Sequence, residues 1–154
     1  MSFECSFATD GVDYELLIED DGQVCYAYLY DADGKISGHV WLYNRGPNPK
    51  SFEDPRGAPP RNPEEFVADE RIALPESGED VSAQWWRTGG VLYARVFIRK
   101  ALVGILAPGT KPGWSALAKK DGPVAKALTP SSPSNVEEIL QEIRDLGTQD
   151  GTAS

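Results

Sequence analysis

The sequence is poor in the residues that build metal centres, disulfide frameworks and covalent catalytic sites. Its 154 residues include one histidine, His39, and two cysteines, Cys5 and Cys25. A single histidine excludes a zinc cluster of the Cys/His kind, and two cysteines are too few for a disulfide framework. Any Ser-His-Asp or Cys-His site would depend on His39 alone, and the sequence has no G-x-S-x-G motif. We therefore predict a protein without metal, cofactor or nucleophilic catalysis.

Long apolar runs are missing as well. No segment approaches the roughly 20 apolar residues of a membrane helix. The first five residues have neither the basic region nor the apolar region of a signal peptide. Hydrophobic residues make up 40% of the chain and charged residues 25%, as in globular domains. These properties predict one cytoplasmic domain over residues 1–147, followed by a disordered tail at 148–154.

Two segments resemble ligand-binding loops, but their spacing is wrong. Residues 104–111 have the glycines of a P-loop, yet Thr110 separates the second glycine from Lys111, so the amine would not reach a phosphate. Residues 31–34, Asp-Ala-Asp-Gly, begin like a calcium loop but lack the third ligand and place glycine two positions early. A hairpin turn explains this second segment.

Turns that contain glycine divide most of the chain into short strands. Asp20-Asp21-Gly22, residues 31–34 and Thr88-Gly89-Gly90 each lie between two alternating segments, as in β-hairpins. The predicted strands are residues 3–7, 14–19, 23–30, 36–43, 81–87, 91–99 and 102–107, with 66–74 as a further candidate. Strands connected by turns rather than by helices predict antiparallel pairing.

The remaining segments are rich in proline or end the chain. Residues 44–65 hold six prolines and predict a long surface loop. Between residues 108 and 133, short helical turns are expected near 115–119 and 124–128. Ser134 to Glu137 form a capping box, and apolar residues at 136, 139, 140, 143 and 146 share one helical face before Gly147. The predicted fold class is α+β: mainly an antiparallel β-sheet or sandwich with one C-terminal helix.

Acidic and basic residues are unevenly distributed along the chain. The 15 basic and 24 acidic residues give a net charge of −9, which disfavours general nucleic-acid binding. Residues 1–86 hold 6 basic and 18 acidic side chains, whereas residues 87–126 hold 8 basic side chains and a single acidic one, Asp121. The two stretches either pair across the fold, or they form a bipolar surface whose acidic side meets a basic partner.

Alternation along two of the predicted strands places aromatic side chains on one face of a sheet. If Cys25, Ala27 and Leu29 point into the core, the residues between them point to the opposite face. The expected members of this face are Tyr26, Tyr28, Tyr30, His39, Trp41 and Tyr43. The face is either covered by another layer or serves in recognition, because Tyr and Trp are frequent in binding hot spots.

Three segments give the chain a resemblance to a known class of proteins. They are residues 26–47, YAYLYDADGKISGHVWLYNRGP, residues 111–115, KPGWS, and residues 120–126, KDGPVAK. In general character, over about residues 12–128, the chain resembles small acidic bacterial proteins of the immunity type. Such proteins are encoded beside polymorphic toxins and neutralise them by plugging or covering the active site of the toxin. The resemblance implies a binding protein without catalytic residues, and no binding residue is transferred from it.

The sequence thus favours a non-catalytic immunity protein whose partner is a basic toxin domain that acts in the cytoplasm. We expect it to bind neither nucleic acid nor membrane directly. The alternatives are a small-molecule or carbohydrate-binding β-domain, with Trp41, Trp85 or Trp86 as stacking platforms, and an enzyme with carboxylate chemistry. The candidate partner-binding residues are Asp20, Asp21, Asp31, Asp33, Tyr28, Tyr30, Trp41 and Trp86. The four aspartates are expected in exposed hairpin turns.

Overall fold

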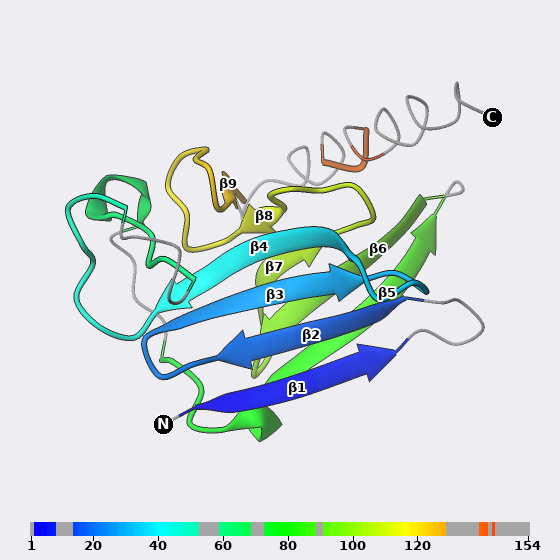
Figure 1. Ribbon diagram of the computed structural model, residues 1–154, viewed down its shortest axis with the longest axis horizontal. Helices are drawn as coiled ribbons and strands as arrows, with labels where there is room; N and C mark the ends of the chain where they lie inside the picture. The colour runs from blue at the N-terminus through cyan, green and yellow to red at the C-terminus, as the bar shows by residue number, and fades with distance from the viewer. Residues whose placement is uncertain are drawn as a thin grey trace.

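Two β-sheets form the protein in the computed structural model, which describes residues 2–8, 14–52, 59–68, 73–88, 91–128, 139–141 and 143. The sheets lie one behind the other in Figure 1. The first contains β1 (Phe3–Ala8), β2 (Glu15–Asp20), β3 (Val24–Tyr30) and β4 (Ile36–Asn44), in chain order. The second contains β5 (Val81–Thr88), β6 (Val91–Ile98), β7 (Ala101–Leu106), β8 (Trp114–Ser115) and β9 (Lys126–Ala127). The β8–β9 pair is parallel and the other pairs are antiparallel.

The predicted antiparallel β architecture is confirmed, and seven of the predicted strands match β1 to β7 within a residue or two. The strand proposed at 66–74 is wrong for its described residues. Phe66 ends a short 3-10 helix, η1 (Glu64–Phe66), and Val67 forms a single bridge with Ala118. Helical turns near 115–119 and 124–128 are also wrong, because Ser115 and the Lys126–Ala127 pair lie in β8 and β9.

Two of the predicted glycine turns are confirmed by their backbone geometry. Gly22 and Gly34 have φ angles of 93° and 77°, in the left-handed region that favours glycine. In the second turn the amide of Gly34 donates to the carbonyl of Asp31, and the register shifts beside Tyr30, as expected for a turn with a glycine bulge. Gly89 and Gly90 lie outside the described residues.

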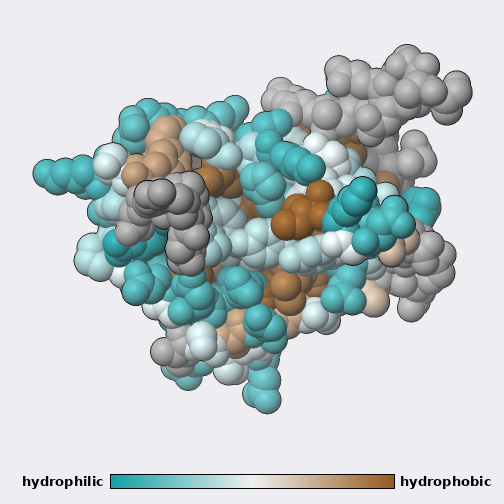
Figure 2. Space-filling model, viewed as in Figure 1, coloured by the Kyte–Doolittle hydropathy of each residue, from teal (hydrophilic) through white to brown (hydrophobic). Residues whose placement is uncertain are grey.

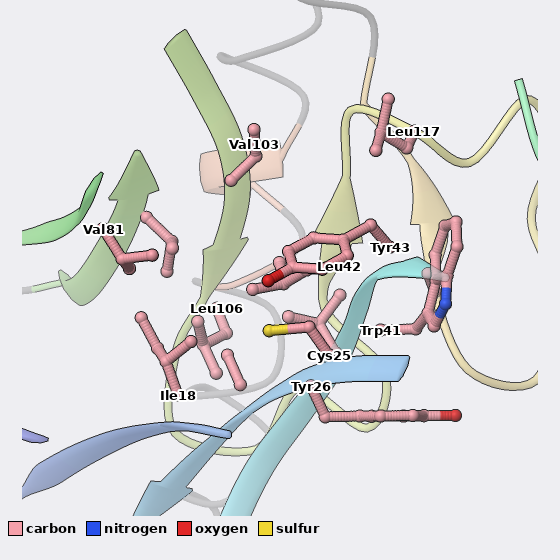
Figure 3. Close-up of a cluster of buried hydrophobic side chains, with 14 of the residues drawn as sticks. Ile18, Cys25, Tyr26, Trp41, Leu42, Tyr43, Val81, Val103, Leu106 and Leu117 are labelled. Atoms are coloured by element: carbon pink, nitrogen blue, oxygen red, sulfur yellow. The ribbon is translucent and has the colours of Figure 1, made fainter. Parts of the chain in front are cut away.

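The core lies between the two sheets, where the inward-facing side chains of both are buried. It combines Leu16 and Ile18 of the first sheet with Val96, Val103 and Leu106 of the second. Figure 3 shows part of this cluster. A second 3-10 helix, η2 (Gly78–Asp80), leads into β5. The face-to-face packing makes the fold a β-sandwich.

A bulge between β3 and β4 corrects the expected aromatic face. The cross-strand partners are Cys25 with Tyr43 and Tyr26 with Trp41, so Leu42 is an extra residue on β4. Tyr43 therefore turns to the core face beside Cys25, whereas Trp41 stays with Tyr26 (Figure 3). The prediction that Tyr43 shares the face of Trp41 is wrong for this reason.

The outer edge of β4 is closed by another part of the chain. The amide of His39 donates to the carbonyl of Thr110 over 3.0 Å, and that of Trp41 donates to Val124 over 2.9 Å. Gly38 is needed here, since a Cβ atom would lie 2.9 Å from the carbonyl oxygen of Ala107. From Ser37 to Trp41 this edge is hydrogen-bonded to other parts of the chain, so that stretch is not available to a partner strand.

A third layer packs on the far side of the second sheet. Residues 139–141 and 143 are helical, and Ile139 and Ile143 are buried against Tyr93, Ile105 and Trp114. Their spacing of four residues agrees with the predicted apolar helical face. The capping box at 134–137, residue 146 and the tail at 148–154 lie outside the described residues, so the α+β class and the domain boundaries stay predictions.

Candidate functional site

The candidate site is the outer face of the four-stranded sheet, which we call the tyrosine face. Cross-strand pairing places Leu17 beside Tyr28 and Tyr28 beside His39 in one row across three strands. A neighbouring row begins with Glu4 and Glu19 and continues to Tyr26 and Trp41. The tyrosine face is defined here by Leu17, Tyr28, Tyr30 and His39 with the acidic residues Glu4, Glu15 and Glu19.

The central side chains of the tyrosine face are half-buried, and one end of the face is covered. Leu17, Tyr28, Tyr30 and His39 all have intermediate exposure. At the covered end, the hydroxyl of Tyr26 donates to the carbonyl of Pro60 over 2.7 Å, and burial raises the Tyr26 pKa. The rings of Tyr26 and Tyr28 stack with centroids 5.9 Å apart. Figure 2, viewed from this side, shows apolar groups among hydrophilic ones.

The electrostatics of the tyrosine face are acidic. Burial first, and then the charge of Glu19 and its neighbours, raise the pKa of Tyr28 to about 12. Burial, followed by the positive charge of Lys111, lowers the pKa of His39, so the imidazole is neutral at pH 7. Burial raises the pKa of Glu19, and a hydrogen bond with Glu4 and the negative charge of Glu4 raise it further. Two carboxyl groups face each other here without a cation in the same row.

We expect Glu19→Gln to raise the free energy of unfolding at pH 7 by a few tenths of a kcal/mol, because like charges directly opposite each other destabilise a sheet. The raised pKa of Glu19 favours the protonated folded state, so the destabilisation is absent below its ordinary value of 4.5 and appears as pH rises through the folded value. Urea unfolding of the variant and the parent at several pH values measures this difference.

Glu15→Gln is the matched control for this prediction. Glu15 lies on the same strand and face, but its cross-strand partners are Ala8 and Tyr30 rather than a carboxylate. Glu15→Gln should raise the free energy of unfolding at pH 7 less than Glu19→Gln does. An equal gain from both substitutions would mean that net charge, rather than the Glu4–Glu19 pair, is responsible.

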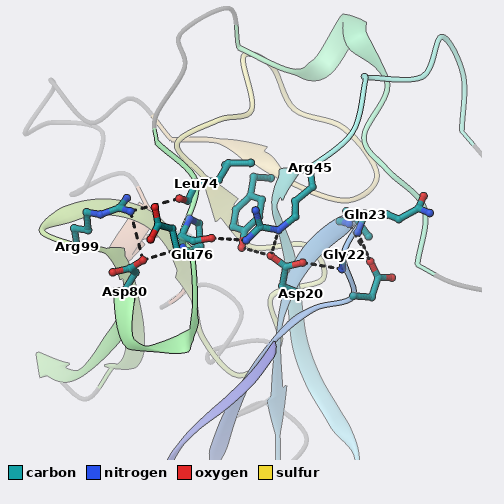
Figure 4. Close-up of polar contacts among 12 residues, drawn as sticks. Asp20, Gly22, Gln23, Arg45, Leu74, Glu76, Asp80 and Arg99 are labelled. Atoms are coloured by element: carbon teal, nitrogen blue, oxygen red, sulfur yellow. Dashed lines mark hydrogen bonds and ion pairs between the residues drawn. The ribbon is translucent and has the colours of Figure 1, made fainter. Parts of the chain in front are cut away.

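Asp20 was expected in an exposed turn, and this prediction is wrong. The residue is 1% exposed, and its carboxylate accepts hydrogen bonds from the Tyr43 hydroxyl and the Gly22 amide, at 2.6 and 2.8 Å. It also pairs with Arg45, with Nε 2.6 Å from Oδ2 (Figure 4). Asp20 is the last residue of β2, where alternation turns its side chain inward beside Ile18. It stabilises the fold and is not available to a partner.

The other predicted aspartates lie at opposite ends of the tyrosine face. One Asp21 oxygen accepts from the amides of Gln23 and Val24, and one Asp31 oxygen accepts from those of Asp33 and Lys35. Asp21 and Asp33 are exposed, as expected, and Asp31 is half-buried. These groups close the turns locally and also place negative charge around the face.

The two predicted tryptophans lie far from one another in the fold. Trp41 is fully buried, and its indole N–H donates to the Asn44 side chain over 2.8 Å, so it is not a surface anchor. Trp86 is 41% exposed on the outer face of the second sheet, where it stacks with Arg95 at 4.5 Å. Trp85 is half-buried against the core. The structure therefore unites Tyr28 and Tyr30 in one site and leaves the tryptophans out.

Sequence reasoning missed Leu17, Glu4, Glu15 and Glu19. Each lies on β1 or β2, at positions that alternate with buried or half-buried residues of the same strand. That alternation was a usable signal for which face they occupy. Their position beside the tyrosines could not be predicted from the sequence, because it depends on which strands pair and in which register.

The uneven charge of the sequence becomes a spatial asymmetry, because each sheet is built from one continuous stretch of chain. In the described residues 2–8 and 14–44, the first sheet and its turns carry seven acidic side chains and one lysine. The second sheet and its connections, over 91–128 with Arg87, carry eight basic side chains and one acidic one. The strands of the two sheets therefore differ in the sign of their charge, and two of the basic side chains are paired, Arg99 with Asp80 and Lys120 with Glu65.

Within the described ranges, no group of three His, Cys, Asp or Glu side chains is placed to hold a metal ion. No helix in that part of the chain is long and apolar enough to cross a membrane. The thiol of Cys25 is buried, and burial raises its pKa, which makes it a poor nucleophile. The site offers half-buried rings and carboxylates on a broad sheet face.

The class that the fold and site define is a β-sandwich with an acidic, aromatic sheet face. No family model, curated protein or solved structure matches the chain.

Proposed function

We propose that this protein is a non-catalytic inhibitor of the immunity type, which binds a basic, cytoplasm-acting toxin domain through the tyrosine face and covers the active site of that domain. The observation that carries the proposal is the row of Leu17, Tyr28 and His39, half-buried and flanked by carboxylates. Apolar surface bordered by polar side chains is typical of protein interaction sites, which supports a role of this row in binding.

The composition of the tyrosine face supports a protein partner of opposite charge. Tyrosine rings supply contact area at low entropic cost and are common binding hot spots. The carboxylates of Glu4, Glu15 and Glu19 would attract Lys and Arg side chains and speed the encounter. The closed edge of β4 leaves the face, rather than that edge, as the route of recognition.

A matched pair of alanine substitutions tests the proposal. With the product of the neighbouring gene as the partner, we expect Tyr28→Ala to raise the dissociation rate about 30-fold, the effect of losing about 2 kcal/mol at a hot spot. Trp86→Ala removes an exposed aromatic side chain on the opposite sheet and should leave the rate unchanged. Surface plasmon resonance at two salt concentrations gives both rate constants, and the association rate should fall as salt rises.

Co-expression provides the second readout. The intact protein should restore growth to cells that produce the neighbouring gene product, and Tyr28→Ala should restore it less well at equal protein level. Absence of rescue together with absence of a complex at micromolar concentration would remove the proposal. A loss of binding in Trp86→Ala, with Tyr28→Ala unaffected, would assign recognition to the second sheet instead.

A further inference from the structure

A cavity of about 580 Å³ lies beside the end of β4, away from the turn that joins β3 to β4. Polar side chains on its wall come from Asn44, Arg45 and Asn48, and the apolar side chains include Val67, Leu74 and Leu117. Its volume lies within the range of about 300–1,000 Å³ that is usual for small-molecule sites. A mixed wall of this kind suits a ligand with one polar edge and an apolar body.

The polar wall is held rigidly by the side-chain amide of Asn44. Its Oδ1 accepts from the Trp41 indole and the Asn62 amide, at 2.8 and 3.0 Å. Its Nδ2 donates to Asn48 Oδ1 over 2.9 Å and to the Asn62 carbonyl over 2.8 Å. The side-chain Oδ1 of Asn62, a residue 1% exposed, has no hydrogen-bond partner in the described structure. Asn62 is not part of the cavity lining and the Asn44 amide is already fully hydrogen-bonded, so the polar side chains left for a ligand are those of Arg45 and Asn48.

The apolar wall is fixed by backbone hydrogen bonds between distant segments. The amide of Ala68 donates to the carbonyl of Leu117 over 2.7 Å, and that of Lys119 donates to Phe66 over 2.8 Å. Val67 forms a β-bridge with Ala118 in the same place. These bonds tie residues 66–68 to residues 117–119, so this wall of the cavity is preformed.

Arg45 determines the charge that the cavity accepts. Its Nε lies 2.6 Å from Asp20, its Nη2 donates to the carbonyl of Pro75, and the guanidinium lies over the Tyr43 ring, 5.6 Å from the centroid. Arg45 is the charged member among the described lining residues, and 17% of its side chain remains exposed. Because Asp20 already balances its charge, an anion gains little here, whereas a neutral acceptor can still use an N–H group.

We propose that this cavity binds a small uncharged molecule with a carbonyl edge and a compact apolar body, such as a lactam or a carboxamide of a heterocycle. The carbonyl accepts from N–H groups of Arg45 and Asn48, and the body packs against Val67, Leu74 and Leu117. The site is separate from the tyrosine face and does not depend on the toxin partner.

Neutral carbonyl compounds and carboxylates of similar size test the proposal on the intact protein. We expect nicotinamide and δ-valerolactam to shift the NMR signals of Asn48 Nδ2, Arg45 Nε and the Leu117 methyl groups at millimolar concentration. Nicotinate and pentanoate should bind about tenfold more weakly. Tighter or equal binding of the carboxylates, or no shift of these groups with either neutral probe, would overturn the proposal.

Leu74→Trp places a larger side chain at the half-buried wall and should abolish the shifts caused by nicotinamide. Ile36→Trp is the matched control, because Ile36 is 41% exposed at the opposite end of β4. Unchanged shifts in a folded Leu74→Trp variant would show that the probe binds elsewhere. The comparison of neutral and charged probes uses the native protein and is decisive even where this variant does not fold.

Discussion

Replacement of Asp20 by alanine is expected to lower the free energy of unfolding by about 3–5 kcal/mol, because it removes one partner of a buried ion pair. Arg45 would lose its carboxylate, and the hydroxyl of Tyr43 and the amide of Gly22 would lose their acceptor. For a domain of this size the loss corresponds to a fall in Tm of roughly 6–20 °C. Thermal and urea unfolding, followed by circular dichroism, measure it.

Asp33→Ala is the control for Asp20→Ala. Asp33 is an exposed aspartate of the next turn, and its removal should change stability by no more than about 0.5 kcal/mol. Arg45→Met should also be strongly destabilising, and the double variant Asp20→Ala/Arg45→Met should lose less than the two single losses added together. Additive losses would mean that the ion pair itself is not what Asp20 contributes.

Replacement of Ile139 by aspartate should release the third layer from the second sheet. We expect it to lower the free energy of unfolding by about 3 kcal/mol or more. Ile139 is 2% exposed and contacts the cluster that contains Tyr93, Ile105 and Trp114. A carboxylate there has no partner in the described part of this cluster, and an unpaired buried charge is costly. Urea unfolding gives the change, and near-ultraviolet circular dichroism reports on the packing of the aromatic side chains, Trp114 and Tyr93 among them.

The matched variant for this layer is Gln141→Asp, on an exposed position of the same helical stretch. It introduces the same carboxylate in water and should cost less than about 1 kcal/mol. Similar small losses for Ile139→Asp and Gln141→Asp would mean that the helical segment is a solvated appendage. The sequence spacing predicts an apolar face that includes positions 139 and 143, and the burial of Ile139 and Ile143 gives this variant its structural basis.

The strands were predictable because turn chemistry and alternation act over a few residues. Gly22 and Gly34 take positive φ angles that other residues avoid, so hairpins at these positions follow from local sterics. The short strands β8 and β9 were not predictable in this way. They have two residues each, and they exist because β8 pairs with β7 and with residues 126–127, which are distant from it in the sequence.

The candidate site was predictable only in part. Tyr28 and Tyr30 were placed together by alternation, and the structure agrees. Trp41 follows the same alternation and lies on the same face, but it is fully buried. Alternation predicts the face on which a side chain lies, whereas its burial depends on the segments that pack over that face. The exposure of Asp20 was mispredicted because the residue was assigned to the turn, whereas it ends β2 on the same face as Leu16 and Ile18.

What the sequence determined by itself is the set of local choices: strand lengths, hairpin turns, the absence of Cys/His-rich chemistry and the separation of acidic from basic stretches. The tertiary structure decided everything that depends on distant residues. The bulge at Leu42 turned Tyr43 inward, the register set Glu4 opposite Glu19, and Arg45 reached back to Asp20. Local backbone preferences are encoded over a few neighbouring residues, whereas pairing, covering and charge balance arise only when the two sheets pack.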